Sequence, residues 1–179
     1  MNDSVQQVQY GKLWVKHENV LYPICVNNDG YLQVIFGDVE GETFTITMLS
    51  HPSIGGETAF EFRTASGRQV TGAGGNVLRE AQRELAVPGP ACRILHQDVA
   101  GEGNLHWVRL QTLDTRFITL YEQVAISERK VKPWSGWSLH PYENVTRYEP
   151  RATDLLRMAE PGDLPPSDFL LQWVEEPTG

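Results

Sequence analysis

The chain has few cysteines, no long hydrophobic run and no excess of basic residues. Cys25 and Cys92 are its two cysteines and lie far apart in the 179 residues, which favours free thiols over a disulfide framework. The ~18 consecutive apolar residues of a transmembrane helix occur nowhere. The opening MNDSVQQVQYGK lacks the basic start and apolar segment of a signal peptide. We therefore expect a soluble, cytoplasmic protein that does not enter membranes.

The charge balance also excludes some partners. With 15 basic and 23 acidic residues the net charge is −8, which argues against nucleic acid as a partner, because phosphates require a basic face. An acidic surface serves solubility or the binding of a basic protein partner. Motif chemistry is sparse as well: no two histidines have zinc-ligand spacing, and no serine lies in a G-x-S-x-G elbow.

Strand patterns dominate the first half of the chain. The segments VLYPICV and YLQVIFG flank NNDG, residues 27–30, whose residues favour the conformations of a hairpin turn. TFTITML and TAFEFRT alternate apolar and polar residues, as half-buried strands do. Further strands are expected in ACRILHQDV, LHWVRLQTL and RFITLYEQVAI.

Helical spacing is expected to replace this alternation in three places. From Asn76, a good N-cap, Val77, Leu78, Ala81 and Leu85 recur at helical intervals until the turn at Val87–Pro88. TDLLRMAE and SDFLLQWVEE predict two shorter helices near the C-terminus, with PGDLPP between them. We therefore predict an α+β fold, a mixed β-sheet flanked by helices, with residues 1–160 as one domain and residues 161–179 as a linker and C-terminal helix packed on it.

A glycine-rich turn precedes the first expected helix. In TGAGGN the backbone N–H groups around Gly72, Gly74 and Gly75 would bind a diphosphate, aided by the helix dipole. Arg68 and Arg79 are the nearest cations. The segment lacks the Walker lysine and the Rossmann spacing, so a plain loop entering a helix is the alternative interpretation.

The helix itself carries a family motif. Arg83–Glu84–Leu85 match R-E-U of the Nudix box, G-x5-E-x7-R-E-U-x-E-E-x-G-U, and HPSIGGETAFEFRTASG resembles the preceding strand, with Glu61 at its glutamate. The span from about His51 to Leu113 thus resembles a degenerate Nudix domain of the ADP-ribose pyrophosphatase type. The resemblance implies a Nudix-like fold and a nucleoside-diphosphate-type ligand.

The departures from the box bear on catalysis. Val87 and Pro88 stand where the family has glutamates that hold Mg²⁺ or Mn²⁺, and Gly75 stands at the upstream glutamate. Glu84 remains, and Glu80 would share a helix face with it at i, i+4. This pair is the candidate catalytic and metal-binding pair, with Mg²⁺ or Mn²⁺ the cofactor implied only if the protein is active. A solvated face that alternates glutamates and arginines is the alternative.

The aromatic loop KPWSGWSLHPYENVTRY offers Trp137 as a stacking surface for a base, or forms a lid over the core. The sequence thus predicts a protein that binds a nucleotide-type small molecule or a protein partner, without efficient hydrolysis. Two alternatives stay open: a divergent Nudix pyrophosphatase acting on ADP-ribose or a related nucleotide, and an acidic protein-binding module of the inhibitor or immunity type.

Overall fold

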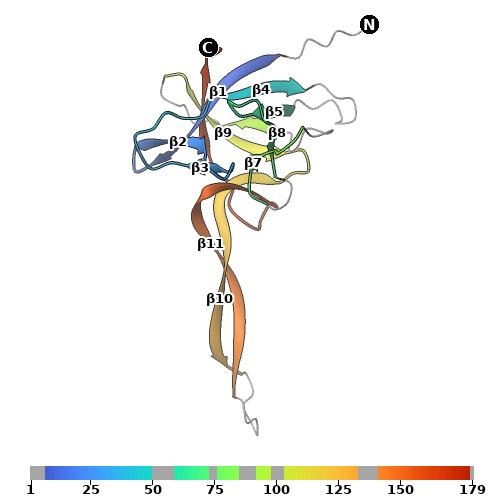
Figure 1. The fold of residues 1–179 in the computed structure, drawn as a ribbon. Coiled ribbons are helices and arrows are strands. Elements are labelled where there is room, and N and C mark those ends of the chain that lie inside the picture. Colours follow the sequence, from blue (N-terminus) through green and yellow to red (C-terminus); the bar gives the residue numbers. More distant parts are fainter. Residues whose placement is uncertain are drawn as a thin grey trace.

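The computed structural model describes residues 7–49, 59–72, 76–84, 92–97, 103–132 and 141–177. Within these ranges the protein is all-β and contains no helix (Figure 1). The strands are β1 (Val8–His17), β2 (Val20–Val26), β3 (Leu32–Val34), β4 (Phe44–Leu49), β5 (Ala59–Arg63), β6 (Val70–Thr71), β7 (Arg79–Glu80), β8 (Cys92–His96), β9 (Leu105–Thr112), β10 (Phe117–Val131), β11 (Tyr142–Ala159) and β12 (Phe169–Val174).

The strands close into a barrel. From β1, hydrogen-bonded neighbours run through β2, β3, β11, β10, β9 and β12 and back to β1, a circuit of seven strands. A second path joins β1 to β9 through β4, β5 and β8. The registered strand pairings among the described residues are antiparallel, with no mixed sheet.

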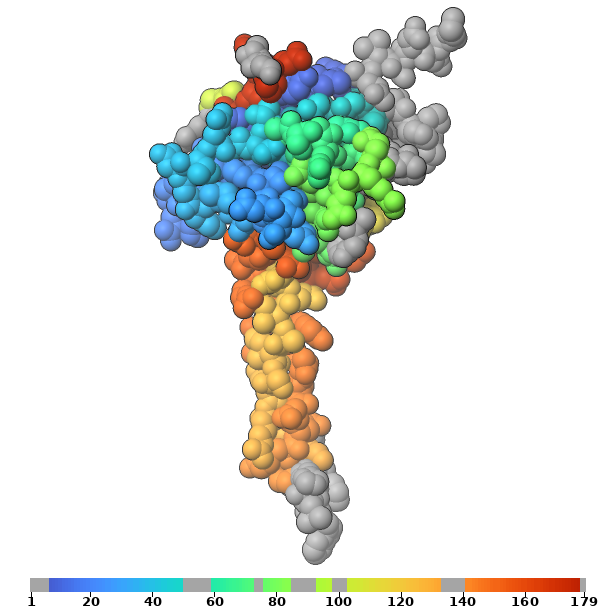
Figure 2. All heavy atoms as spheres, in the orientation of Figure 1, coloured from blue at the N-terminus to red at the C-terminus, as the bar shows by residue number. Residues whose placement is uncertain are grey.

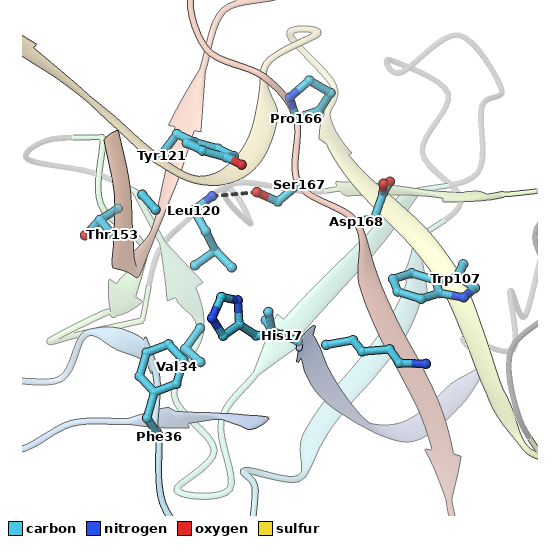
Figure 3. Close-up of a pocket in the computed structure, with 13 residues that line it drawn as sticks. His17, Val34, Phe36, Trp107, Leu120, Tyr121, Thr153, Pro166, Ser167 and Asp168 are labelled. Carbon is cyan, nitrogen blue, oxygen red and sulfur yellow. Dashed lines mark hydrogen bonds between the residues drawn. The ribbon is translucent and has the colours of Figure 1, made fainter. Parts of the chain in front are cut away.

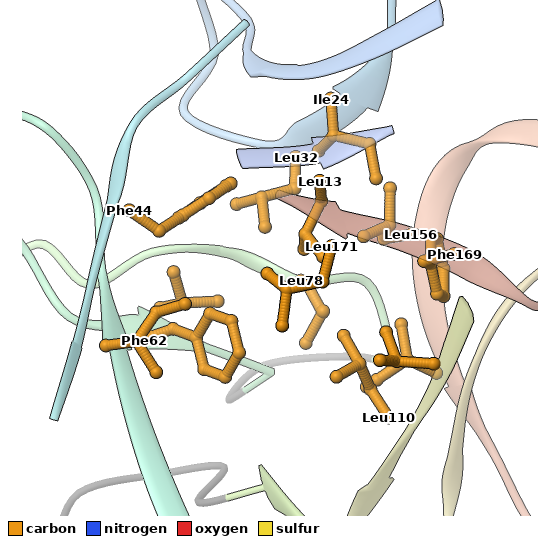
Figure 4. Close-up of a cluster of buried hydrophobic side chains, with 14 of the residues drawn as sticks. Leu13, Ile24, Leu32, Phe44, Phe62, Leu78, Leu110, Leu156, Phe169 and Leu171 are labelled. Carbon is orange, nitrogen blue, oxygen red and sulfur yellow. The ribbon is translucent and has the colours of Figure 1, made fainter. Parts of the chain in front are cut away.

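Alternating side chains build the core inside this barrel. On β4, Phe44 and Ile46 are fully buried and the intervening threonines are not, as the period of two predicts. They belong to one cluster of buried side chains that also includes Leu13, Leu78 and Phe169 (Figure 4). The strands expected from this alternation are confirmed, and so is the turn after β2, where Asn27 Oδ1 accepts hydrogen bonds from the N–H groups of Asp29 and Tyr31.

The helix expected from Asn76 is wrong for the described residues 76–84. Leu78 and Ala81 are buried, but the backbone between them is extended. Leu78 N–H donates to Leu156 O (2.8 Å), and Leu78 O accepts from Leu32 N–H (3.0 Å). Hydrogen bonds to strands on both sides, together with a place in the core, outweigh a helical spacing of apolar residues that has only local support.

The two C-terminal helices are also corrected. TDLLRMA lies in β11, where Leu156 and Met158 are buried at a period of two. FLLQWV is β12, which lies between β1 and β9. The predicted α+β fold, with a sheet flanked by helices, is therefore wrong. No helix in the described ranges is long and apolar enough to cross a membrane.

A long hairpin projects from the barrel. β10 and β11 continue beyond their base as eleven residue pairs, from Tyr121 opposite Ala152 to Val131 opposite Tyr142, a length of about 35 Å. We call residues 121–131 and 142–152 the arm. Figures 1 and 2 show it standing away from the barrel. Over these residues neither strand has another described sheet neighbour.

Candidate functional site

Two of the acidic residues singled out by the Nudix resemblance, Glu61 and Glu84, lie around one arginine, Arg63. Glu84 accepts hydrogen bonds from both terminal nitrogens of the Arg63 guanidinium, at 2.6 and 3.2 Å. This contact lowers the pKa of Glu84 and raises that of Arg63. Glu61 Oε1 lies 3.1 Å from the same guanidinium and accepts from Gln69 Nε2 at 2.9 Å. Both carboxylates therefore already have donors within the chain.

Glu80 is held separately. Its Oε2 accepts hydrogen bonds from the hydroxyls of Thr64 and Ser66, each at 2.6 Å. Because β7 is extended, the i, i+4 helix face that would bring Glu80 and Glu84 together does not exist. Among the described residues no group of three histidine, cysteine or acidic side chains is placed to hold a metal ion. The catalytic and metal-binding roles of Glu80 and Glu84 remain predictions, without the helix on which they rested.

Only part of the expected diphosphate site at TGAGGN lies among the described residues. Gly72 is buried at the end of β6 and Arg68 is exposed in the turn after β5. The Arg79 guanidinium lies 5.5 Å from the Tyr31 ring centroid. The segment at residues 76–84 supplies no helix dipole for a phosphate. Gly74, Gly75 and Trp137 lie outside the described residues.

The arm has two unlike faces, because directly opposite residues of a hairpin point to the same side. The first, which we call the open face, is exposed throughout. It comprises Gln123, Ala125, Ser127, Arg129 and Val131 of β10 and Tyr142, Asn144, Thr146, Tyr148 and Pro150 of β11. Tyr148 is 66% exposed and Val131 63%. Arg129 is the one charge on this face, and it packs over the Tyr142 ring at 4.3 Å.

The opposite side, which we call the charged face, is bound together by ion pairs. Glu122 contacts Arg151 (2.6 Å) and Arg157 (3.3 Å), and Glu128 contacts Arg147 (2.6 Å). Hydrogen bonds from Arg151 and Arg147 lower the pKa of Glu122 and Glu128, respectively. Most charges of this face are therefore paired within the chain, whereas the residues of the open face are exposed.

The backbone of the arm presents two outer edges. Lys132 N–H donates to Pro141 O at 2.8 Å, just beyond the pair of Val131 with Tyr142. Hydrogen-bonded and non-hydrogen-bonded pairs alternate along an antiparallel ladder. Open-face residues therefore form the non-hydrogen-bonded pairs, and their N–H and C=O groups point outward. Pro150 is one of them, so the missing N–H of this proline lies on the outer edge of β11 and costs the hairpin no ladder bond.

The base of the arm is firmly anchored. The register changes between Thr119 and Tyr121, where β11 has extra residues and bends into the barrel. Thr119 Oγ1 donates to Pro165 O (2.7 Å), and Leu120 N–H donates to Ser167 Oγ (2.8 Å). Ile118 and Leu156 are fully buried just below. The arm is thus continuous with the core and not a loosely tethered loop.

A groove of about 440 Å³ opens beside this base (Figure 3). Its walls include Phe36 and Trp107 of the barrel, Tyr121 of the arm, and Ser167 and Asp168 of the segment before β12. Tyr121 lies opposite Ala152, two residues below Gln123 and Pro150, so both side chains belong to the side of the open face. The open face and the groove therefore form one continuous surface.

Comparison of the chain with protein-family models, curated proteins and solved structures gives no significant match. The candidate site is therefore defined by geometry alone.

Sequence reasoning missed the arm, although a signal was present. Glu122 lies as far before the midpoint of residues 132–141 as Arg151 lies after it, and Lys130 and Glu143 are matched in the same way. Such mirrored opposite charges are the pattern of cross-strand pairs in a long hairpin. The first strand was expected, but Pro150 and the apparent helix at residue 153 concealed the second.

Proposed function

We propose that this protein is a protein-binding module in which the barrel is a rigid base and the arm presents the binding surface. One observation carries the proposal: eleven residue pairs project from the barrel with no other sheet neighbour among the described residues. A two-stranded ribbon in water is marginally stable on its own, and its unpaired edges are templates for another strand. An arm of this length is best explained by a partner that covers it.

The composition of the open face supports a protein partner. Tyrosines, small residues and one arginine occupy it, and acidic residues are absent. Cores of protein–protein interfaces are enriched in tyrosine and depleted in charge in the same way. Tyrosine offers a large, rigid contact area at low entropic cost.

The charge of the arm supports the same conclusion. The arm carries four acidic and four basic residues, so it is neutral within a chain of net charge −8. The acidic residues are Glu122, Glu128, Glu143 and Glu149, and the basic ones are Arg129, Lys130, Arg147 and Arg151. A neutral arm is not steered towards a polyanion such as nucleic acid; its contacts must be short-range and shape-dependent.

This proposal takes up the protein-binding alternative from the sequence, but moves it from an acidic surface to the neutral arm. The nucleotide-binding alternative has weaker support, because its glutamates are paired with Arg63, Thr64 and Ser66.

Site-specific photo-crosslinking in the intact chain tests the proposal. A photoreactive residue replaces Ala125 or Tyr148 on the open face, and Val39, 47% exposed in the connection between β3 and β4, is the control position. Irradiation in cells that make the protein, followed by mass spectrometry, should give defined protein adducts at Ala125 and Tyr148 and few at Val39. Equal yields at all three positions would overturn the proposal.

A further inference from the structure

We propose that the arm binds a second copy of this chain, with the outer edges of the two β10 strands paired antiparallel about a two-fold axis. This inference rests on the proposed function and names its partner. Three features support it. The outer edge of β10 is free to pair, the charges along β10 complement those of a second antiparallel β10, and the barrel is too broad for arms to lie side by side.

The two outer edges of the arm are not equivalent. On β11, Pro150 removes an outward N–H group, and proline is a common means of blocking edge pairing. On β10 no proline occurs between Gln123 and Val131, and the side chains at the outward-pointing positions are all exposed. β10 is therefore the edge that accepts another strand.

The charges of β10 are self-complementary in one register. Pairing two β10 strands antiparallel about Ile126 places Glu122 of each copy opposite Lys130 of the other, with the two Ile126 side chains in contact. Opposite charges across strands stabilise a sheet and like charges destabilise it. A slip that brings Glu122 opposite Glu128 is repulsive, and a slip of the same size in the other direction moves Glu122 opposite Lys132, which lies beyond the end of β10.

The shape of the molecule selects the two-fold arrangement over a side-by-side one. If β10 of one copy met β11 of the next, the two arms would run in the same direction. Their barrels would then be set about 10 Å apart, two strand spacings. Figure 2 shows a barrel much broader than the arm, so side-by-side barrels would collide. The two-fold pairing sends the barrels to opposite ends of the paired arms.

The barrel is hollowed where the partner reaches it. In the proposed register Val131 of the second copy lies opposite Tyr121. Tyr121 and the adjacent Leu120 line the groove at the base of the arm (Figure 3). The apolar side chains of Phe36 and Trp107 stand on its barrel side. The groove thus gives room to the end of the partner's β10.

A matched pair of proline substitutions tests the free edge. Ser127 and Thr146 are directly opposite, exposed and both in a non-hydrogen-bonded pair, so proline at either position removes an outward N–H and no ladder bond. Sedimentation velocity over a range of concentrations should show a reversible dimer for the wild type and Thr146→Pro. Ser127→Pro should weaken dimerisation at least tenfold. Equal loss in both variants, or a monomeric wild type, would overturn the proposal.

Thiol crosslinking tests the register independently of proline tolerance. With Cys25 and Cys92 replaced by serine, chains carrying Ala125→Cys are mixed with chains carrying Ser127→Cys and treated with a short bismaleimide. The proposed register places these positions opposite each other, so the mixture should crosslink more than either variant alone. Preferential crosslinking of Ser127→Cys with Thr146→Cys would show side-by-side arms and overturn the two-fold pairing.

Different results would reject the protein-binding function and the second copy as its partner. Photo-crosslinks from Ala125 and Tyr148 to a different protein, with no dimer in sedimentation, would leave the protein-binding function standing and reject the second copy as partner. Absence of arm adducts together with a monomeric chain would reject both.

Discussion

The hydroxyl of Ser167 is one of the groups that anchor the base of the arm to the barrel. Ser167, 8% exposed, accepts the N–H of Leu120 at the point where the β10–β11 register changes. Ser167 is the first residue of SDFLLQWVEE, which the sequence predicted as a helix, and a serine hydroxyl at the start of a helix also accepts a backbone N–H. The residue does accept one, but from a strand 47 positions away. The chemistry of the residue was predictable and its partner was not.

Ser167→Ala should destabilise the protein by about 1–3 kcal/mol, because the partly buried N–H of Leu120 loses its hydrogen-bond partner. Urea unfolding followed by circular dichroism measures the change. Ser127→Ala, an exposed serine on the open face, is the control and should shift stability by less than about 0.5 kcal/mol. Equal effects of the two substitutions would contradict the anchoring role.

Glycine at position 11 lies where the core leaves little space for a side chain. A Cβ there would lie 3.1 Å from Ile46 Cδ1 and 3.1 Å from Leu171 Cδ1. We expect Gly11→Ala to cost about 1–3 kcal/mol, the usual range for overpacking. Gly37→Ala is the matched control, since its Cβ would meet nothing closer than 3.9 Å. Thermal unfolding of both variants checks this prediction, and equal melting temperatures would disprove it.

For the secondary-structure elements, the alternation of apolar and polar residues predicted strands correctly, whereas the helical spacing of apolar residues predicted helices that the described residues do not form. β4 and β5 repeat an apolar–polar period that no helix satisfies, so the sequence predicted them correctly. The segment around Leu78 fits both a helix and a strand. Its backbone partners, Leu32 and Leu156, are remote in sequence, and a local pattern carries no information about them. The same holds for the Arg63 that binds Glu84.

The arm should loosen in acid before the barrel does. In the folded state the pKa values of Glu122 and Glu128 lie below the ordinary 4.5. Their ion pairs therefore stabilise the arm fully above that pH, and this contribution is lost as the pH falls through the folded-state values. Hydrogen exchange of arm amides relative to barrel amides should accelerate below pH 4.5.

Glu128→Gln is the control for this pH effect. The variant lacks one of the two ionised partners of Arg147, the other being Glu149, so its arm should exchange faster at neutral pH and respond less to acid. An arm that keeps the same exchange ratio to the barrel from neutral to acidic pH would contradict the prediction.

At the scale of the whole molecule, the chain is a β-barrel from which a long hairpin projects. The nucleotide alternative makes a different prediction, which is measurable. We expect ADP-ribose with Mn²⁺ to leave the melting temperature unchanged and to remain unhydrolysed, because Glu61, Glu80 and Glu84 already accept hydrogen bonds within the chain. A ligand that binds the folded state raises its stability. A shift that Glu84→Gln abolishes would restore the nucleotide site.

The alternation of the arm's two faces constrains how its length can vary. Adding or deleting one residue in either strand would move every residue beyond that point to the opposite face. A viable change must therefore come as two residues in each strand, which lengthens or shortens the arm by about 7 Å. In the proposed dimer each such step would also change the distance between the two barrels. The length of the hairpin would then set the distance between the two barrels, in steps of two residues per strand.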